Sequence, residues 1–67
     1  MIEIQYTKYI YNYESIRKAI SDFKHLSRIR VLRENQDGWV LGFDKCKYGE
    51  ERTAREFENY MIGLENQ

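Results

Sequence analysis

The sequence predicts a small α+β domain with the element order strand, helix, strand, strand, helix. Three observations lead to this prediction. Apolar and polar residues alternate at the start of the chain, apolar residues recur at helical spacing in two later segments, and an Asp37-Gly38 turn joins two further alternating runs. At 67 residues the chain has the size of one domain, so residues 1–67 are treated as a single unit.

Residues 2–11 are expected to form the first strand. Ile2, Ile4 and Tyr6 fall on one face, and the residues between them are polar. The alternation is lost after Thr7, so we expect a bulge or the end of the strand near Lys8.

Residues 13 to about 25 are expected to form the first helix. Asn12 is a favourable N-cap, and Glu14 lies in the first turn, where an acidic side chain suits the helix dipole. The apolar residues of this segment have the spacing of one helical face: Ile16, Ala19, Ile20 and Phe23.

A hairpin is expected to follow, with strands at residues 27–34 and 39–44. Asp37-Gly38 provides residues that tolerate the positive φ values of tight hairpin turns. The second of these strands is the most apolar in the chain, which favours a central place in the sheet, and Gly42 within it would permit a close approach. The apolar spacing at residues 50–64 predicts the last helix.

The preferred strand order is 1-3-2, with both helices on one face. A strand-helix-strand crossover makes the first two strands parallel, and the hairpin makes the third antiparallel to the second. Placing the third strand between the other two makes every neighbouring pair antiparallel. This arrangement is a truncated ferredoxin-like sheet that lacks its fourth strand, and the order 1-2-3 is the alternative.

Charge is balanced overall but unevenly distributed along the chain. Residues 1–33 contain seven basic and three acidic side chains, whereas residues 34–67 contain four basic and eight acidic ones. Such an uneven charge distribution favours oriented docking or pairing of copies of the chain.

The single cysteine, Cys46, cannot form an internal disulfide, and no segment has the features of a membrane span or a secretory signal. We therefore expect a cytoplasmic protein with no membrane partner.

Nothing in the sequence assembles into catalytic machinery, so we expect no enzyme, no catalytic residue and no cofactor. His25 is the only histidine, and with Cys46 it gives too few ligands for a structural metal site. His25 is more simply a helix-end residue, and Cys46 is either an inert loop thiol or a reactive one.

Aromatic and basic residues suggest a surface for a partner. The six tyrosines are either packing residues or marks of an interface, where tyrosine is enriched. A missing fourth strand would leave an edge that a peptide or protein segment can extend. The residues expected to contact a partner are Tyr6, Tyr9, Tyr11, Arg28, Arg30 and Arg33. The alternatives are a structural adaptor, a homodimer, or weak nucleic-acid binding through Arg28, Arg30 and Arg33; the neutral charge makes nucleic acid the less favoured partner.

Two segments carry a resemblance to a known family. They read Tyr9-Ile10-Tyr11-Asn12-Tyr13-Glu14-Ser15-Ile16-Arg17-Lys18-Ala19-Ile20 and Glu56-Phe57-Glu58-Asn59-Tyr60-Met61-Ile62. The chain resembles the small HxsD-like accessory proteins of His-Xaa-Ser peptide-modification systems, and it departs from their pattern at residues 63–67. The resemblance implies an accessory role beside a radical SAM maturase that acts on a ribosomally made precursor peptide. It implies no iron-sulfur cluster on this chain and transfers no catalytic residue.

Overall fold

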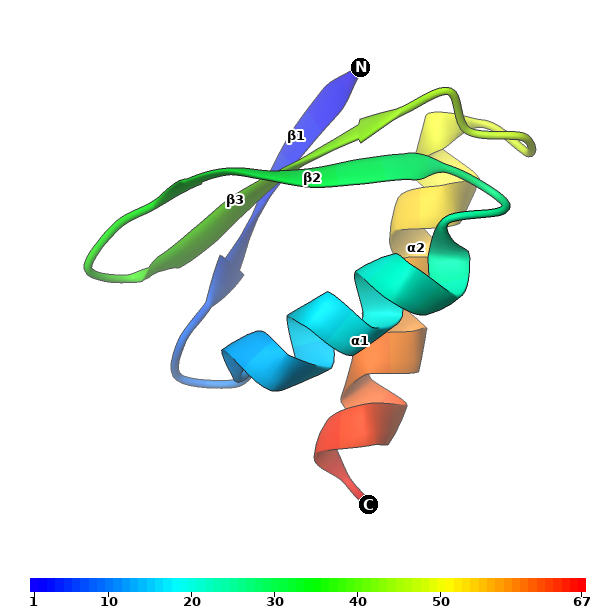
Figure 1. The fold of residues 1–67 in the computed structure, drawn as a ribbon. Coiled ribbons are helices and arrows are strands. Elements are labelled where there is room, and N and C mark those ends of the chain that lie inside the picture. The colour runs from blue at the N-terminus through cyan, green and yellow to red at the C-terminus, as the bar shows by residue number, and fades with distance from the viewer.

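The computed structural model describes residues 1–67, and it contains a single three-stranded sheet with two helices. The elements, in chain order, are β1 (Ile2–Thr7), α1 (Tyr13–Phe23), β2 (Arg28–Glu34), β3 (Gly38–Asp44) and α2 (Glu50–Glu65). The strand order is β1-β3-β2 and both pairings are antiparallel, which confirms the predicted 1-3-2 order. Both helices lie on the same side of the sheet (Figure 1).

β1 is shorter than predicted, because the chain turns after Thr7 instead of continuing to residue 11. The amide of Tyr11 donates to the carbonyl of Thr7 at 3.0 Å, and the amide of Tyr9 donates to the Thr7 hydroxyl at 3.2 Å. The loss of alternation after Thr7 thus marks the end of the strand.

Asn12 caps α1 as predicted. Its side-chain oxygen accepts the amide hydrogen of Ser15 at 3.0 Å. The carboxylate of Glu65, near the end of α2, accepts the backbone amide of Asn12 at 2.9 Å and its side-chain amide at 3.0 Å. These bonds hold the end of α2 against the beginning of α1. The helix ends at Phe23, two residues before the predicted end.

The hairpin turn uses a different device from the one predicted. Neither Asp37 nor Gly38 has a positive φ. Instead, the Asn35 side chain accepts the amides of Asp37 at 2.9 Å and Gly38 at 3.0 Å, which is an Asx turn. Gly38 is required for another reason: a Cβ atom there would lie 2.0 Å from the carbonyl oxygen of Tyr6 on β1.

The pairing of β2 with β3 shifts register between Val31 and Arg33, an irregularity that the sequence did not predict. Near this shift, the Leu32 side chain lies over Gly42, where an added Cβ would meet Leu32 Cδ1 at 2.9 Å. Gly42 therefore accommodates an aliphatic side chain on the face of the sheet opposite the helices.

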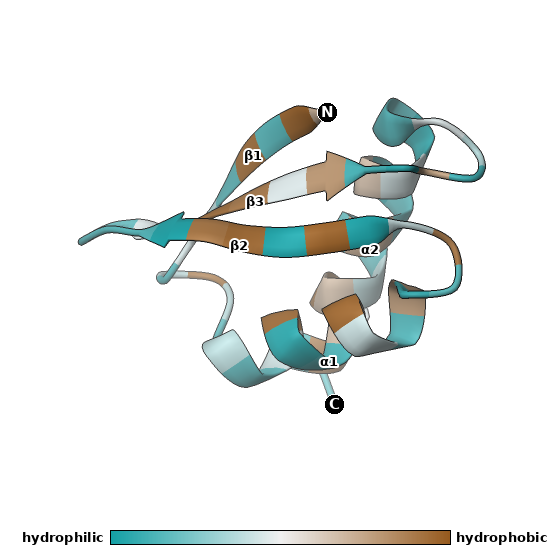
Figure 2. Cartoon of the chain, turned by 45° about the horizontal axis from the view of Figure 1, so that its top comes forward, coloured by the Kyte–Doolittle hydropathy of each residue, from teal (hydrophilic) through white to brown (hydrophobic).

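The core lies between the sheet and the helices. Figure 2 shows hydrophobic residues alternating with hydrophilic ones along β2, as expected for a strand with one buried face. Phe57 of α2 is central, because its ring meets Phe43 edge-on at 5.3 Å and Phe23 at 5.4 Å.

Candidate functional site

The outer edge of β1 is the free edge of the sheet nearest the predicted partner-binding tyrosines. The amide of Lys8 donates to the carbonyl of Asp37 at 2.9 Å. In an antiparallel pair the bonded residues alternate, so Ile2, Ile4 and Tyr6 bond to β3. The main-chain groups of Glu3, Gln5 and Thr7 consequently point away from β3, toward the side where no strand lies.

The turn after β1 presents two apolar side chains beside this edge. The side chain of Tyr9 is 90% exposed and that of Ile10 is 61% exposed. The carbonyl of Thr7 accepts the amides of Ile10 and Tyr11, which holds the turn in place. The neighbouring Lys8 is fixed as well, since its ammonium group donates to Glu34 at 2.8 Å and lies 5.4 Å from the centre of the Trp39 ring.

Tyr6 and Tyr11, which the sequence placed in the partner surface, lie in the core and are only 3% and 6% exposed. Their rings meet edge-on at 5.6 Å, and Tyr6 also packs on Phe57. Burial, with the nearby Glu58 carboxylate, raises the pKa of the hydroxyls of Tyr6 and Tyr11. These two rings therefore support the turn from below, and Tyr9 alone of the three is open to a partner.

The three arginines lie on β2 but in different electrostatic settings. Arg33 donates to the Glu3 carboxylate on β1 at 3.1 Å, an ion pair that crosses the open face of the sheet. Arg28 and Arg30 are exposed and form no ion pair. On the face of the sheet opposite the helices, the side chain of Val40 is only 7% exposed. β1 and β2 are opposite edges of the sheet, so Arg28 and Arg30 lie apart from the β1 edge, whereas the side chain of Arg33 reaches Glu3 on β1.

Sequence reasoning missed Ile10 and the Glu3–Arg33 pair. Ile10 falls on the same alternation as Ile2, Ile4 and Tyr6, so a continuous strand would have buried it. The polar run Thr7-Lys8 was the only indication of the turn that exposes it. The cross-sheet ion pair depends on the register of all three strands, which local patterns do not specify.

Cys46 is half-buried in the loop between β3 and α2. Its sulfur lies 2.9 Å from the Ser27 hydroxyl, which also donates to the carbonyl of Asp44 at 3.2 Å. These contacts join the loop to the start of β2. No three His, Cys, Asp or Glu side chains come together as a set of metal donors, and neither helix is long and apolar enough to cross a membrane.

Comparison with known proteins gives no match for this chain among family models, curated proteins or solved structures.

Proposed function

We propose that this protein is a non-catalytic accessory protein that binds an extended peptide along the free edge of β1. One observation carries the proposal: the outward main-chain groups of Glu3 and Gln5 pair with no strand, and they lie on the strand that leads into the exposed side chains of Tyr9 and Ile10. A peptide strand can add to such an edge through main-chain hydrogen bonds, each contributing about 1 kcal/mol net.

The side chains around the edge fit an added strand. Ile2 and Ile4 are only partly buried against the core, on the side of the sheet that carries the helices. Alternate side chains of a bound peptide would cover these two residues, and burying a large aliphatic side chain contributes about 1.5–3 kcal/mol. Tyr9 and Ile10 would contact the end of the peptide that lies nearest the turn. An aromatic side chain beside an open edge is typical of binding surfaces.

The occupant that we propose is the precursor peptide of a ribosomal-peptide maturation system, presented in the cytoplasm to a radical SAM maturase. The support for this choice is the resemblance to HxsD-like proteins in residues 9–20 and 56–62, together with the open edge itself. A second copy of the chain, paired edge to edge, is the competing occupant. In that case the protein would be a structural homodimer.

The experiment uses a displayed library of random 12-residue peptides as the probe. Selected peptides are titrated into isotope-labelled protein, and we expect amide shifts concentrated in residues 2–11. The decisive variant is Gln5→Pro, because proline removes the outward amide without removing a bond to β3. Its matched control is Gln5→Ala, which keeps the amide. We expect Gln5→Pro to abolish binding and Gln5→Ala to retain it.

Tyr9→Ala provides a second test of the same site. Because the Tyr9 ring is almost fully exposed, its loss should change the free energy of unfolding by less than about 0.5 kcal/mol. We expect peptide affinity to fall by about tenfold while the melting temperature stays constant.

Peptide-induced amide shifts confined to residues outside 2–11 would refute the proposal. Peptide binding by Gln5→Pro that equals binding by the parent protein would refute it as well. A dimer by light scattering that Gln5→Pro converts to a monomer would favour the second copy as occupant.

A further inference from the structure

A basic pocket lies on the β2 side of the molecule, away from the β1 edge. It has a volume of about 420 Å³ and is formed by the end of α1, the start of β2 and the loop between β3 and α2. Its base is apolar and at least partly buried, and its rim is exposed and basic. The rim residues are Lys24, His25, Arg28, Lys45 and Lys47, and the base residues are Ile20, Leu26 and Ile29.

The positive charges of this rim are not neutralised. Elsewhere on the surface, Lys8, Lys18 and Arg33 each have a carboxylate partner within 3.3 Å. None of the rim side chains forms an ion pair, and no acidic residue lines the pocket. The nearest acidic residue in sequence, Asp44, uses its carboxylate to accept the amide of Lys45 at 2.8 Å. Gathering like charges lowers the stability of the fold, so their concentration around one concave site indicates a ligand that compensates them.

The loop that carries two of the lysines is held in position by hydrogen bonds. The amide of Lys47 donates to the carbonyl of Leu26 at 2.8 Å, and the Ser27 hydroxyl donates to the carbonyl of Asp44. Lys45 adopts the left-handed conformation, with φ of 50°, which is unfavourable for a residue other than glycine. The basic side chains, which come from the run Lys24–Arg28 and from the loop with Lys45 and Lys47, are therefore carried on a backbone held in position around the pocket.

We propose that this pocket binds a small phosphorylated ligand of nucleotide size. Its phosphate groups would lie among the side chains of Lys24, Arg28 and Lys47, because basic side chains form charge-assisted hydrogen bonds with phosphate oxygens. An apolar or aromatic portion would rest on the base residues. The volume lies within the range of small-molecule sites, which is about 300–1,000 Å³.

A longer nucleic acid fits the surroundings less well than a small ligand. A bound strand requires a positive track longer than one pocket. Along β2, Arg30 continues the positive charge, but Arg33 is neutralised by Glu3.

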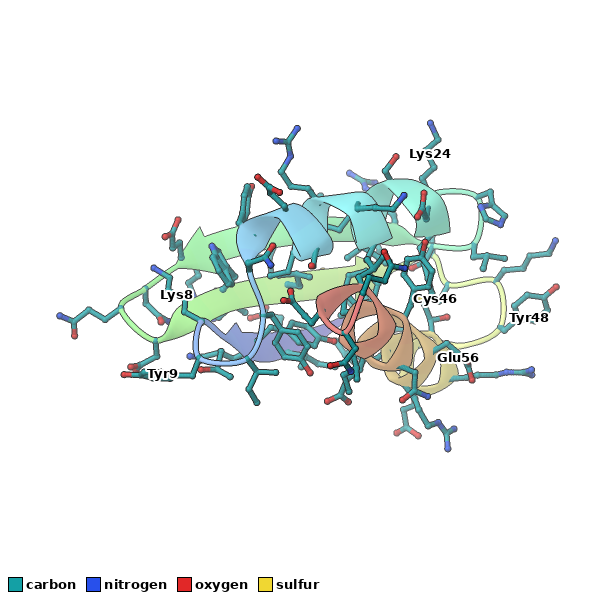
Figure 3. The ribbon with its side chains drawn as sticks, turned by 90° about the horizontal axis from the view of Figure 1, so that it is seen from below. Lys8, Tyr9, Lys24, Cys46, Tyr48 and Glu56 are labelled. Carbon is teal, nitrogen blue, oxygen red and sulfur yellow. The ribbon has the colours of Figure 1, made fainter.

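This pocket is independent of the proposed peptide site. β1 and β2 are the two outer strands of the sheet. Figure 3 shows Tyr9 near one end of the molecule and Lys24 near the other end. Loss of ligand binding at the pocket would therefore leave peptide binding at β1 intact, and the two proposals can fail separately.

The test is a titration of ADP into the labelled full chain, with adenosine as the uncharged comparison. We expect ADP, but not adenosine, to shift the amides of residues 24–29 and 45–47. The test variant combines Lys24→Gln with Lys47→Gln. The native side chains of Lys24 and Lys47 are exposed and form no side-chain hydrogen bond, so their replacement should not disturb the fold. Its matched control is Lys8→Gln with Lys18→Gln, which removes the same net charge from residues that do not line the pocket. We expect the affinity for ADP to fall at least about tenfold in the test variant and less than about threefold in the control.

The absence of ADP shifts up to 10 mM, or an equal loss of affinity in both double variants, would overturn the proposal. Tighter binding of a 10-nucleotide RNA than of ADP, with shifts extending along β2 to Arg33, would assign the surface to nucleic acid instead.

Discussion

Gly38 offers the sharpest test of the packing between β1 and β3. A Cβ atom at this position would lie 2.0 Å from the carbonyl oxygen of Tyr6 and 3.0 Å from the Cα atom of Thr7. An ordinary carbon–oxygen contact is about 3.3 Å or longer, so Gly38→Ala forces the two strands apart by roughly 1 Å. Both obstructing atoms belong to the backbone and cannot rotate away.

The expected loss follows from two contributions. Overpacking typically costs about 1–3 kcal/mol, and the movement weakens the adjacent hydrogen bond from Lys8 to Asp37, which contributes about 1 kcal/mol. We therefore expect Gly38→Ala to lower the free energy of unfolding by about 2–4 kcal/mol. The total free energy of unfolding of a domain of this size is about 3–10 kcal/mol. The melting temperature should accordingly fall by about 10–30 °C.

Two other glycines provide matched controls in urea unfolding and thermal melts. At Gly42 the nearest obstacle is the flexible end of the Leu32 side chain, so Gly42→Ala should cost less than about 1 kcal/mol. At Gly63 an added Cβ meets no atom within 4 Å, and Gly63→Ala in α2 should stabilise by about 0.5–1 kcal/mol. A Gly38→Ala variant that melts within about 3 °C of the parent protein would refute the close approach.

Three further predictions concern α2 and its contact with α1. Phe57→Ala should lower the free energy of unfolding, measured in urea titrations, by about 3–5 kcal/mol, because the buried ring contacts three other aromatic rings. A loss below about 1 kcal/mol would contradict the central place of Phe57 in the core. Asn12→Ala should cost about 1 kcal/mol or more, with reduced helicity by circular dichroism, because it removes the cap of α1. The hydrogen bond from the backbone amide of Asn12 lowers the pKa of the Glu65 carboxyl group below its usual 4.5. The ionised carboxylate therefore stabilises the folded state fully above pH 4.5. This stabilisation is lost as the pH falls through the lower pKa that Glu65 has in the folded state. The stability difference between the parent and Glu65→Gln should therefore shrink between pH 6 and pH 3, and a difference independent of pH would contradict the contact.

The sequence was sufficient for the order of the elements and the topology of the sheet. Periodicity distinguished strands from helices, and the geometry of the crossover together with antiparallel pairing selected the order β1-β3-β2. The cap at Asn12 was also predictable, because a cap depends on a few neighbouring residues.

The details that the sequence did not reveal depend on contacts between distant segments. The role of Gly38 comes from the proximity of β1, and the Asx turn at Asn35 replaced the expected positive φ values. The tyrosines could not be divided by pattern alone, because Tyr6, Tyr9 and Tyr11 have similar neighbours but very different burial. Their separation depends on the turn after Thr7, which places Tyr11 back under the sheet.

The bonds between Glu65 and Asn12 join positions 53 residues apart, and α2 also supplies Phe57 and Met61 to the core. During synthesis, the residues of the sheet and of α1 are translated before those of α2. Until α2 has followed them, the nascent chain lacks one wall of its core and the carboxylate that anchors the first turn of α1. Folding on the ribosome should consequently occur late and in one step, with the emergence of α2 as the event that commits the chain to its native state.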